Sequence, residues 1–313
     1  MSDDRAILDV ALRTVGIPAH ARTDTPTSSG RFPDGAAFRI EIPSCEGPEC
    51  LDAALEEAAR LDVPVTRVSQ GSGVAMLTDA ELDRCARTAA DAGVEVCLFA
   101  RPGGAWSPSA SARAPGGGGL AGAAWGHDQL RACLDDVLRA AAHGFRSVLI
   151  ADVGVLAVFG VLKDSGGVPA GMQAKVSVML PAANAAAAGV LVRLGAGTLN
   201  LPGDLGLADV ATIRDAVAVP LDVYVESPDD LGGIVRLHDV PELIRIASPL
   251  HVKLGVRNAP PLYPSGAHLR ATAVALVRER VRRARLVMEL LERSGSDAIA
   301  SQPGADGLAV PIP

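Results

Sequence analysis

The chain has 313 residues, of which 49% are hydrophobic, so one large domain with a sizeable core is expected. Its formal net charge of −7 argues against nucleic acid or an anionic membrane as a general partner, and 3% aromatic residues leave few platforms for base stacking. Five cysteines, an odd number, and an acidic start without an apolar segment predict a reduced, cytoplasmic protein.

The residue pattern divides the chain into three parts. Residues 1–36 are expected to form an N-terminal arm and linker, with a short helix at Ile7–Val15 followed by a stretch rich in Thr, Pro, Ser and Gly. Residues 37–293 contain eight strand-plus-helix units. Residues 294–313 are expected to be a disordered tail.

Each predicted strand is a short run that precedes a helical stretch. The strands are placed at Phe38–Pro43, Val65–Gln70, Val94–Arg101, Ser147–Asp152, Ala174–Met179, Thr198–Pro202, Leu221–Glu226 and Leu250–Val256. The helices are placed at Pro48–Leu61, Asp79–Ala92, Asp128–His143, Val155–Lys163, Asn184–Leu194, Leu207–Val217, Leu231–Ala247 and Ser265–Arg293. Thr78 is expected to cap the second helix, and Pro241 to interrupt the seventh. A Gly-rich insertion, Pro102–Gly126, is predicted to be a long lid loop.

Charged residues alternate with apolar ones inside these strands, as in Phe38-Arg39-Ile40-Glu41-Ile42. Parallel strands covered on both faces are normally continuous apolar runs, so a period-two polar set must face a space that tolerates charge. The lumen of a closed barrel is such a space, and it opens on the active-site mouth. The sequence therefore predicts an α/β fold, a (β/α)₈ TIM barrel with an N-terminal arm and a long loop after the third strand. An open doubly wound sheet is the rival fold.

Alternation places a charged set inside the barrel or just past a strand end. The set is Arg39, Glu41, Arg67, Lys175, Asp222, Glu226, Lys253 and Arg257. Its five cations and three anions give a net charge of +2, which favours a small anionic substrate such as a carboxylate or phosphate. The alternative is a structural network of ion pairs near the barrel floor. Further polar residues at these strand ends include Ser69, Arg101, Asp152, Ser177, Asp204 and Asn258.

These residues are given provisional roles. The expected catalytic residues are Glu226, Lys253, Glu41 and Lys175, and the expected substrate-binding residues are Arg67, Arg257, Arg39, Gln70, Asn200 and Tyr224. Glu226 is expected to be the acid/base, with Lys253 as its electrophilic partner or as a charge stabiliser. Lys253 should act as an anion clamp if Glu226 dominates its surroundings. If desolvation and Arg257 dominate instead, Lys253 could form an imine with a carbonyl substrate. We favour the clamp.

Metal and cofactor signals are weak. Glu41, Asp222 and Glu226 could offer oxygen ligands to a divalent metal, whereas no histidine spacing suggests zinc. Cys45 follows the first strand and is a minor nucleophile candidate. The Gly116–Gly119 run lacks the Lys-Ser/Thr of a P-loop. The cofactor is therefore unknown, with either none or a divalent metal expected.

Four segments resemble a known family. They are Arg67–Val74, Asn200–Leu205, Pro220–Glu226 and Lys253–Pro260. They are similar to uncharacterised bacterial barrel proteins grouped with the collagenase-like peptidases of unknown catalytic type (peptidase family U32). The resemblance covers about residues 37–292 and implies a TIM barrel and peptidase activity. Some members hold an iron–sulfur cluster through four cysteines, but the cysteines here cannot be matched to those ligands, so no cluster is expected.

The sequence thus predicts an enzyme that acts on a small anionic carbonyl or carboxylate substrate at the C-terminal mouth of a barrel. Lyase, aldolase, isomerase and hydrolase chemistry all remain open. Two alternatives belong to other classes: a peptide hydrolase, as the family resemblance implies, and a non-catalytic ligand-binding or partner subunit. We expect a homo-oligomer without nucleic-acid or membrane partners.

Overall fold

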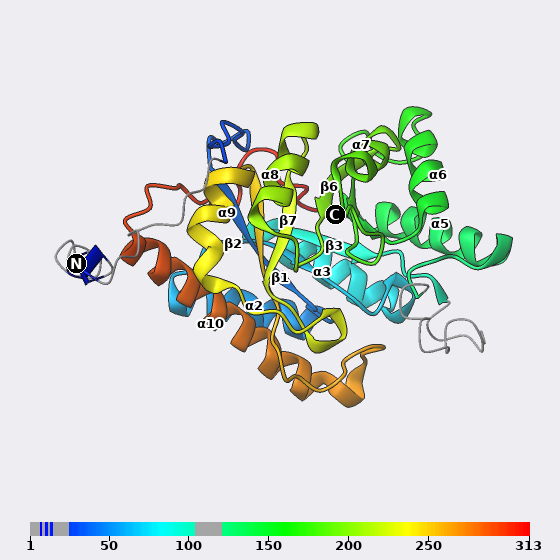
Figure 1. Ribbon diagram of the computed structural model, residues 1–313. Helices are drawn as coiled ribbons and strands as arrows, with labels where there is room; N and C mark the ends of the chain where they lie inside the picture. Colours follow the sequence, from blue (N-terminus) through cyan, green and yellow to red (C-terminus); the bar gives the residue numbers. More distant parts are fainter. Residues whose placement is uncertain (1–6, 8–9, 12, 15–24, 104–120) are drawn as a thin grey trace.

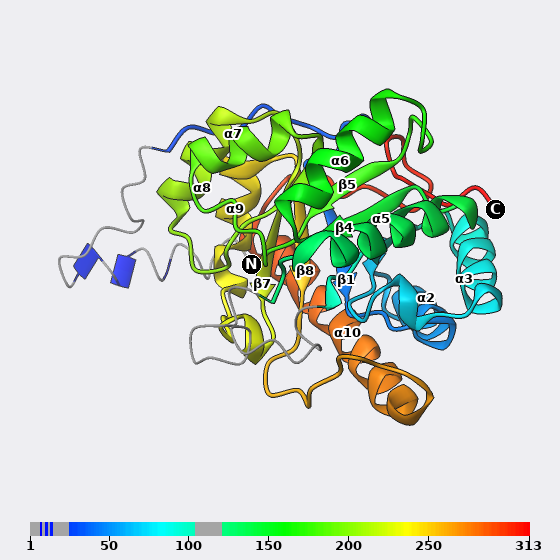
Figure 2. The same cartoon turned by 90° about the vertical axis from the view of Figure 1, so that its right-hand side faces the viewer.

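Eight parallel strands close into a barrel in this protein. The structure is a computed structural model, and it describes residues 7, 10, 11, 13, 14, 25–103 and 121–313. Each strand pairs with its neighbours in chain order, and the last pairs with the first (Figures 1 and 2). The strands are β1 Phe38–Pro43, β2 Val65–Ser69, β3 Glu95–Phe99, β4 Ser147–Ile150, β5 Gln173–Val176, β6 Ala196–Asn200, β7 Leu221–Glu226 and β8 Leu250–Leu254. The predicted (β/α)₈ barrel is confirmed.

Helices surround the barrel and alternate with the strands along the chain (Figure 1). They are α2 Pro48–Leu61, α3 Asp79–Ala92, α5 Gly126–Ala142, α6 Val153–Asp164, α7 Ala185–Arg193, α8 Leu207–Ala216, α9 Val240–Ala247 and α10 Arg270–Ser294. Short 3₁₀ turns are η1 Val74–Met76, η4 Asp229–Leu231, η5 Leu237–Asp239 and η6 Ala267–Leu269. Within the described residues, no helix is both long and apolar enough to cross a membrane.

Local sequence signals explain most helix ends. The Thr78 side chain accepts a hydrogen bond from the Glu81 amide, and Glu81 reaches back to the Thr78 amide, so α3 begins with a capping box. Gly93 ends the same helix in the left-handed conformation that glycine adopts without steric cost. The predicted cap of this helix is therefore confirmed.

Two helix predictions are wrong in detail. Pro241 does not interrupt a helix over Leu231–Ala247; it stands in the first turn of α9, where its missing amide hydrogen leaves no helical bond unmade. The last helix begins at Arg270 and not after Ser265: the Ser265 amide donates to the Ser72 hydroxyl at 2.8 Å, and the chain then forms the 3₁₀ turn η6 before the helix.

Two other predictions fall mainly outside the described residues. The helix expected at Ile7–Val15 and the first part of the linker include residues outside the described ones, and so does most of the Pro102–Gly126 insertion, at residues 104–120. The arm residues that are described reach the barrel floor, where the Ser28 amide donates to the Arg245 carbonyl at 2.8 Å.

The C-terminal segment, residues 295–313, closes the floor of the barrel, so the prediction of a disordered tail is wrong. The amides of Ser301, Gly304 and Ile312 donate to the carbonyls of Phe38, Gly93 and Gly144, at 3.0, 2.8 and 2.8 Å. These acceptors lie at or just before the starts of β1, β3 and β4. The segment is held because it satisfies backbone groups at the N-terminal ends of strands, a role that no periodic pattern in its sequence reveals.

The same segment explains Arg39, whose side chain points to the floor. Its Nε donates to the Ser301 hydroxyl at 3.0 Å, and its terminal nitrogens donate to the carbonyls of Asp306 at 2.6 Å and Gly307 at 3.3 Å. Its guanidinium also lies 4.1 Å from the centre of the Phe32 ring. Arg39 therefore binds the C-terminal segment and does not reach the mouth, where substrate binding was predicted.

Removal of residues 300–313 should destabilise the barrel. The truncation takes away three hydrogen bonds of a charged group together with the cover of the floor, so we expect a loss of about 3–6 kcal/mol in urea denaturation. Arg39→Met should lower the free energy of unfolding much less in the truncated protein than in the full chain, because the truncation has already removed the partners of Arg39. Equal costs of Arg39→Met in both backgrounds would contradict this account of the segment.

Candidate active site

Glu41, on β1, is the centre of a buried cluster of charges. Its Oε2 accepts hydrogen bonds from Nε and Nη2 of Arg67 at 2.9 and 2.6 Å. Its Oε1 accepts from the Ser69 hydroxyl at 2.7 Å and pairs with the ammonium of Lys175. The Nζ of Lys253 lies 3.5 Å from the same oxygen. Three cations from β2, β5 and β8 therefore converge on one carboxylate.

The charges around Glu41 determine its ionisation. Burial by itself would raise the pKa of Glu41, but Arg67, Lys175 and Lys253 outweigh burial and hold that pKa well below its usual value. Burial, aided by Arg67, lowers the pKa of Lys175, while Glu41 opposes this effect. Glu41 is therefore ionised at neutral pH and acts as a fixed counter-charge to its neighbours.

Asp222 and Glu95 complete the cluster on the other sides of Arg67. Asp222 pairs with Arg67 and accepts a hydrogen bond from the Thr198 hydroxyl at 2.8 Å. Glu95 lies 3.5 Å from Nη1 of Arg67 and accepts from the Ser147 hydroxyl at 2.8 Å. Arg67 thus contacts three carboxylates from three strands and is almost completely buried. It is a structural ion-pair centre and not an open binding group.

The lumen is close to neutral, which changes the predicted charge of the site. Its ion pairs within the described residues join the cations Arg67, Lys175 and Lys253 to the carboxylates Glu41, Glu95 and Asp222. The net charge of +2 expected from alternation is therefore not found. The predicted set includes residues that face the floor or lie outside the lumen, and it leaves out Glu95.

Above this cluster a cavity of about 280 Å³ opens at the carboxyl ends of the strands. Its polar walls include Ser44, Ser69, Gln70, Arg101, Ser177, Asn200, Tyr224, Asp230, Lys253 and Tyr263. Its apolar walls include Pro43, Phe99, Leu149, Val178, Met179 and Leu231. This mouth cavity is at the end of the fold where barrel enzymes carry their active sites.

Lys253 joins the mouth cavity to the charge cluster beneath it. Its Nζ donates to Oδ1 of Asn200 at 2.6 Å and lies 4.1 Å from the centre of the Tyr224 ring. Asn200 is oriented in turn by its own donation to the Val176 carbonyl at 2.7 Å. Asn200, Tyr224 and Lys253, three of the predicted site residues, therefore meet in this cavity. All three are almost completely buried.

Arg101 and Tyr263 form another wall of the mouth cavity. Nη1 of Arg101 donates to the Gly71 carbonyl at 2.7 Å, and the guanidinium lies 5.3 Å from the centre of the Tyr263 ring. The Tyr263 hydroxyl is hydrogen-bonded to the Ser44 hydroxyl. Burial, with a smaller contribution from Glu46, raises the pKa of Tyr263, so this hydroxyl keeps its proton and can donate it in a hydrogen bond.

The predicted acid/base residue Glu226 lies away from the mouth cavity. Its Oε1 accepts from the Arg257 amide at 3.0 Å, and its Oε2 lies 3.0 Å from Nε of Arg283 on α10. A register shift between Tyr224 and Glu226 breaks the simple alternation at this end of β7. Arg257 is half exposed and pairs with Asp229 at 3.3 Å. The structure therefore does not bring Glu226 or the Arg257 side chain to Lys253.

Gln70 lines the mouth cavity, but its amide is already engaged. Its Nε2 donates to the Gly73 carbonyl at 3.0 Å, and its Oε1 accepts from the Gly73 amide at 3.0 Å. Gln70 therefore shapes the turn after β2. We assign it no direct role in binding.

The predicted metal ligands do not assemble. Glu41 and Asp222 do lie close together with His251, near enough for one atom from each to approach one ion. However, the guanidinium of Arg67 already pairs with both carboxylates, and Glu226 is bound elsewhere. These residues therefore do not fit a divalent metal.

Two residues of the site carry weak signals in the sequence. Arg101 comes two residues after the end of β3, so the sequence indicates its position at a strand end, but no pattern indicates a role for it. Tyr263 lies in the loop after β8, where neither periodicity nor a motif marks it. Only the folding of that loop over the barrel brings its ring to Arg101.

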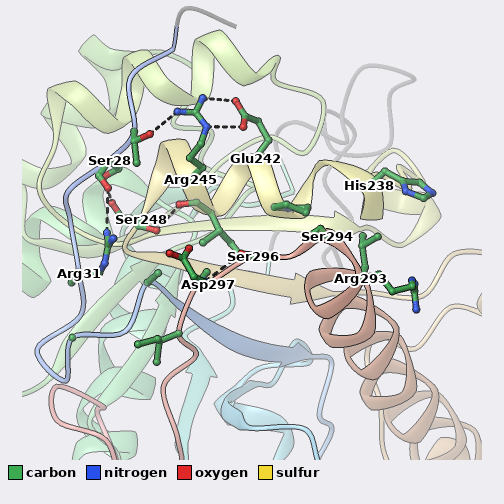
Figure 3. Close-up of a pocket in the computed structure, with 18 residues that line it drawn as sticks. Ser28, Arg31, His238, Glu242, Arg245, Ser248, Arg293, Ser294, Ser296 and Asp297 are labelled. Carbon is green, nitrogen blue, oxygen red and sulfur yellow. Dashed lines mark hydrogen bonds and ion pairs between the residues drawn. The ribbon is translucent and has the colours of Figure 1, made fainter. Parts of the chain in front are cut away.

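A larger cavity, of about 920 Å³, lies at the opposite end of the barrel (Figure 3). Its walls include Ala37 and Ser248, which precede β1 and β8. Its Arg245 is bonded to Glu242, with Nε 2.7 Å from Oε2, and Nη1 of Arg31 donates to the Gly30 carbonyl at 2.7 Å. Because these arginines are engaged and the strand ends are the N-terminal ones, the mouth cavity at the other end is the better candidate for an active site.

Comparison with known proteins shows no family for this chain and no chemistry for its site. No family model matches the chain. No curated protein matches it. Among solved structures, it is similar to a U32 peptidase, with 18% identity, a TM-score of 0.45, and 78% of this chain and 99% of the other covered.

A second similar structure is a truncated 3-deoxy-D-arabino-heptulosonate 7-phosphate synthase from Thermotoga maritima. It has 14% identity and a TM-score of 0.47, with 90% of this chain and 94% of the other covered. Such distant likenesses give no information on substrate or reaction. The fold itself rests on the closed sheet of eight parallel strands.

Replacement of Glu41 should destabilise the fold. Glu41→Gln leaves Arg67 and Lys175 buried without one of their counter-charges, and we expect a loss of about 3–5 kcal/mol in urea denaturation. Glu56→Gln, which removes the exposed partner of Arg278, is the surface control and should cost far less. The double variant Glu41→Gln/Lys175→Met removes one charge of each sign and should cost less than the sum of the single variants. If the stability losses of the two single variants simply add up in the double variant, Glu41 and Lys175 do not stabilise each other.

His251 should make stability depend on pH. Burial, and next Arg67, lowers the pKa of His251 well below its model-compound value of 6.5, so the folded form stays neutral. Below pH 6.5 the unfolded chain binds a proton that the folded chain does not, and stability falls with falling pH by up to about 1.4 kcal/mol per pH unit. His251→Gln should reduce this slope between pH 6.5 and 5 in denaturation curves. Identical slopes would mean that His251 takes up a proton in the folded protein.

Proposed function

We propose that the protein is a barrel enzyme that acts on a small anionic carbonyl or carboxylate compound in the mouth cavity. The observation that supports this most is the placement of Lys253. It is 3% exposed, lines the cavity and presents an ammonium group at its base. Arg101 adds a second cation to the walls. An anionic group of a substrate would find both within a partly apolar pocket, where charge–charge attraction is stronger than in water.

The neighbours of Lys253 suit the role of anion clamp. An amide oxygen, an aromatic face and the Glu41 carboxylate all favour contact with an ammonium group. Lys253 would therefore bind the substrate anion and stabilise negative charge that develops during the reaction. To form an imine, Lys253 would have to become a neutral amine, and it would then lose these contacts.

The hydroxyl groups at the mouth supply the second half of the proposed chemistry. Tyr263 stays protonated and could donate a hydrogen bond to a carbonyl oxygen that becomes an oxyanion, while Ser69 and Ser177 line the same cavity. Aldol cleavage, isomerisation and hydrolysis all pass through such an oxyanion. In this proposal, Tyr263 stands beside Lys253 in place of Glu226, as a hydrogen-bond donor to the developing oxyanion and not as an acid/base.

Variants of Lys253 test the proposal. Lys253→Ala should weaken the binding of pyruvate or oxaloacetate, measured by calorimetry, by about tenfold or more, and Lys253→Arg should retain part of the affinity. Lys163→Ala, which alters a lysine on α6 outside the mouth cavity, is the matched control and should not change binding. Borohydride with a carbonyl compound should leave no covalent adduct on Lys253. Unchanged affinity in Lys253→Ala would remove this residue from the site.

The same preparation separates the alternatives. Cleavage of casein or gelatin by the pure wild-type protein, lost in Lys253→Ala, would favour the peptide hydrolase. An occupied cavity without turnover, together with a stable complex with a second protein, would favour a ligand-binding subunit. Native mass spectrometry would report a retained ligand and the proposed homo-oligomer in one measurement.

A further inference from the structure

A second cavity, of about 290 Å³, adjoins the mouth cavity. The two share four lining residues: Ser44, Arg101, Asp230 and Tyr263. The second cavity lies between the loops after β7 and β8 and reaches α10, with further walls from Pro228, Asp229, Ala259, Pro260, Pro261, Leu262 and Arg280. Tyr263 and its hydrogen-bonded partner Ser44 therefore stand between two compartments at the same mouth.

Arg280 is the unusual residue of this side cavity. It projects from α10 and is 2% exposed. Its Nη1 makes a long hydrogen bond of 3.3 Å to the Ser44 carbonyl, and its buried Nε has no hydrogen-bond partner among the described residues. No carboxylate of the described residues lies within 4.0 Å of its guanidinium nitrogens. A buried guanidinium in this condition is costly unless a ligand supplies the missing acceptor.

The acidic groups near Arg280 are otherwise engaged. Glu46 is half-buried close by, and its two carboxylate oxygens accept from the amides of Gly71 at 2.7 Å and Ser72 at 3.1 Å. Asp229 accepts from the Asn258 amide at 2.6 Å and pairs with Arg257. Asp230 lines both cavities and is exposed. The positive charge of Arg280 is thus left for an anion that enters the side cavity.

The arrangement places cations in both compartments. Lys253 lines only the mouth cavity, Arg280 lines only the side cavity, and Arg101 lines both. We propose that the substrate carries two separated anionic groups, one held by Lys253 and the other by Arg280 with Arg101. A dicarboxylate or a phosphorylated carboxylate has this chemistry. This inference rests on the proposed function and narrows its substrate class.

Binding of one-ended and two-ended anions tests this inference. The probes are 2-oxobutyrate, with one carboxylate, 2-oxoglutarate, with two, and 3-phosphoglycerate, with a carboxylate and a phosphate. We expect wild-type protein to bind at least one two-ended probe more tightly than 2-oxobutyrate in calorimetry. Arg280→Met should weaken the binding of that probe by about 10- to 100-fold and leave the affinity for 2-oxobutyrate within about twofold. The affinity of Arg280→Lys for that probe should lie between those of wild type and Arg280→Met.

The controls distinguish binding from folding. Arg282→Met changes an exposed arginine of the same helix that pairs with Glu279, and it should change no affinity. Because Nε of Arg280 lacks a partner, Arg280→Met should melt at or above the wild-type temperature, whereas a merely structural arginine would lower it. An equal loss for one-ended and two-ended probes, or no loss, would overturn the role of Arg280.

The two proposals can also fail separately. If 2-oxobutyrate binds through Lys253 and the two-ended probes gain nothing, the side-cavity inference falls and the proposed function stands. If the two-ended probes bind through Arg280 but Lys253→Ala does not change their affinity, Lys253 is not an anion clamp. The proposal that the substrate has one anionic group on Lys253 and one on Arg280 is then overturned as well. If no probe binds wild-type protein at millimolar concentration, both proposals fall.

Discussion

The burial of Glu41 at the centre of the barrel is the constraint on which the rest of the lumen depends. A carboxylate there is tolerated only because Arg67, Lys175 and Lys253 approach it from three other strands and Ser69 adds a hydrogen bond. These contacts link strands that are not neighbours in the sheet, such as β1 and β5. The lumen is therefore filled with paired charges where many barrels have layers of apolar side chains.

Along the barrel axis, the buried charge cluster supports the fold, and the mouth cavity above it is the place of the proposed chemistry. Its lower members, Arg67 and Asp222, use their polar atoms on each other and leave little for a substrate. Lys253 belongs to both levels, since it approaches Glu41 below and lines the mouth cavity above. Because the charges of the cluster balance only when Lys253 is counted, its ammonium can meet a substrate anion without a large excess of buried positive charge. The proposed roles of Lys253, Arg101 and Arg280 follow from that division.

The opposite end of the barrel is closed by the C-terminal segment. Arg39 is the inward-facing residue nearest that end, and it binds Ser301, Asp306 and Gly307 rather than a carboxylate of the cluster. The Ala309 amide also donates to Glu95 at 3.3 Å, so the segment reaches the lowest acid of the lumen. The floor therefore depends on residues that follow the last helix, and the molecule uses its terminal segment as part of the core.

The strand pattern in the sequence is enough to predict the barrel and the inward set of its strands. Period-two alternation is a local property, so Glu41, Arg67, Lys175 and Lys253 could be assigned to the lumen from their positions alone. Alternation does not say how far along the axis a side chain lies or whether a strand is shifted at its end. For that reason, alternation by itself puts Glu226 in the site and makes Arg67 a substrate-binding residue, whereas both are held in other ion pairs. The loop after β8 that carries Tyr263 and the helix α10 that carries Arg280 reach the mouth only in the folded chain, because contacts between residues so distant in the chain leave no periodic pattern in it.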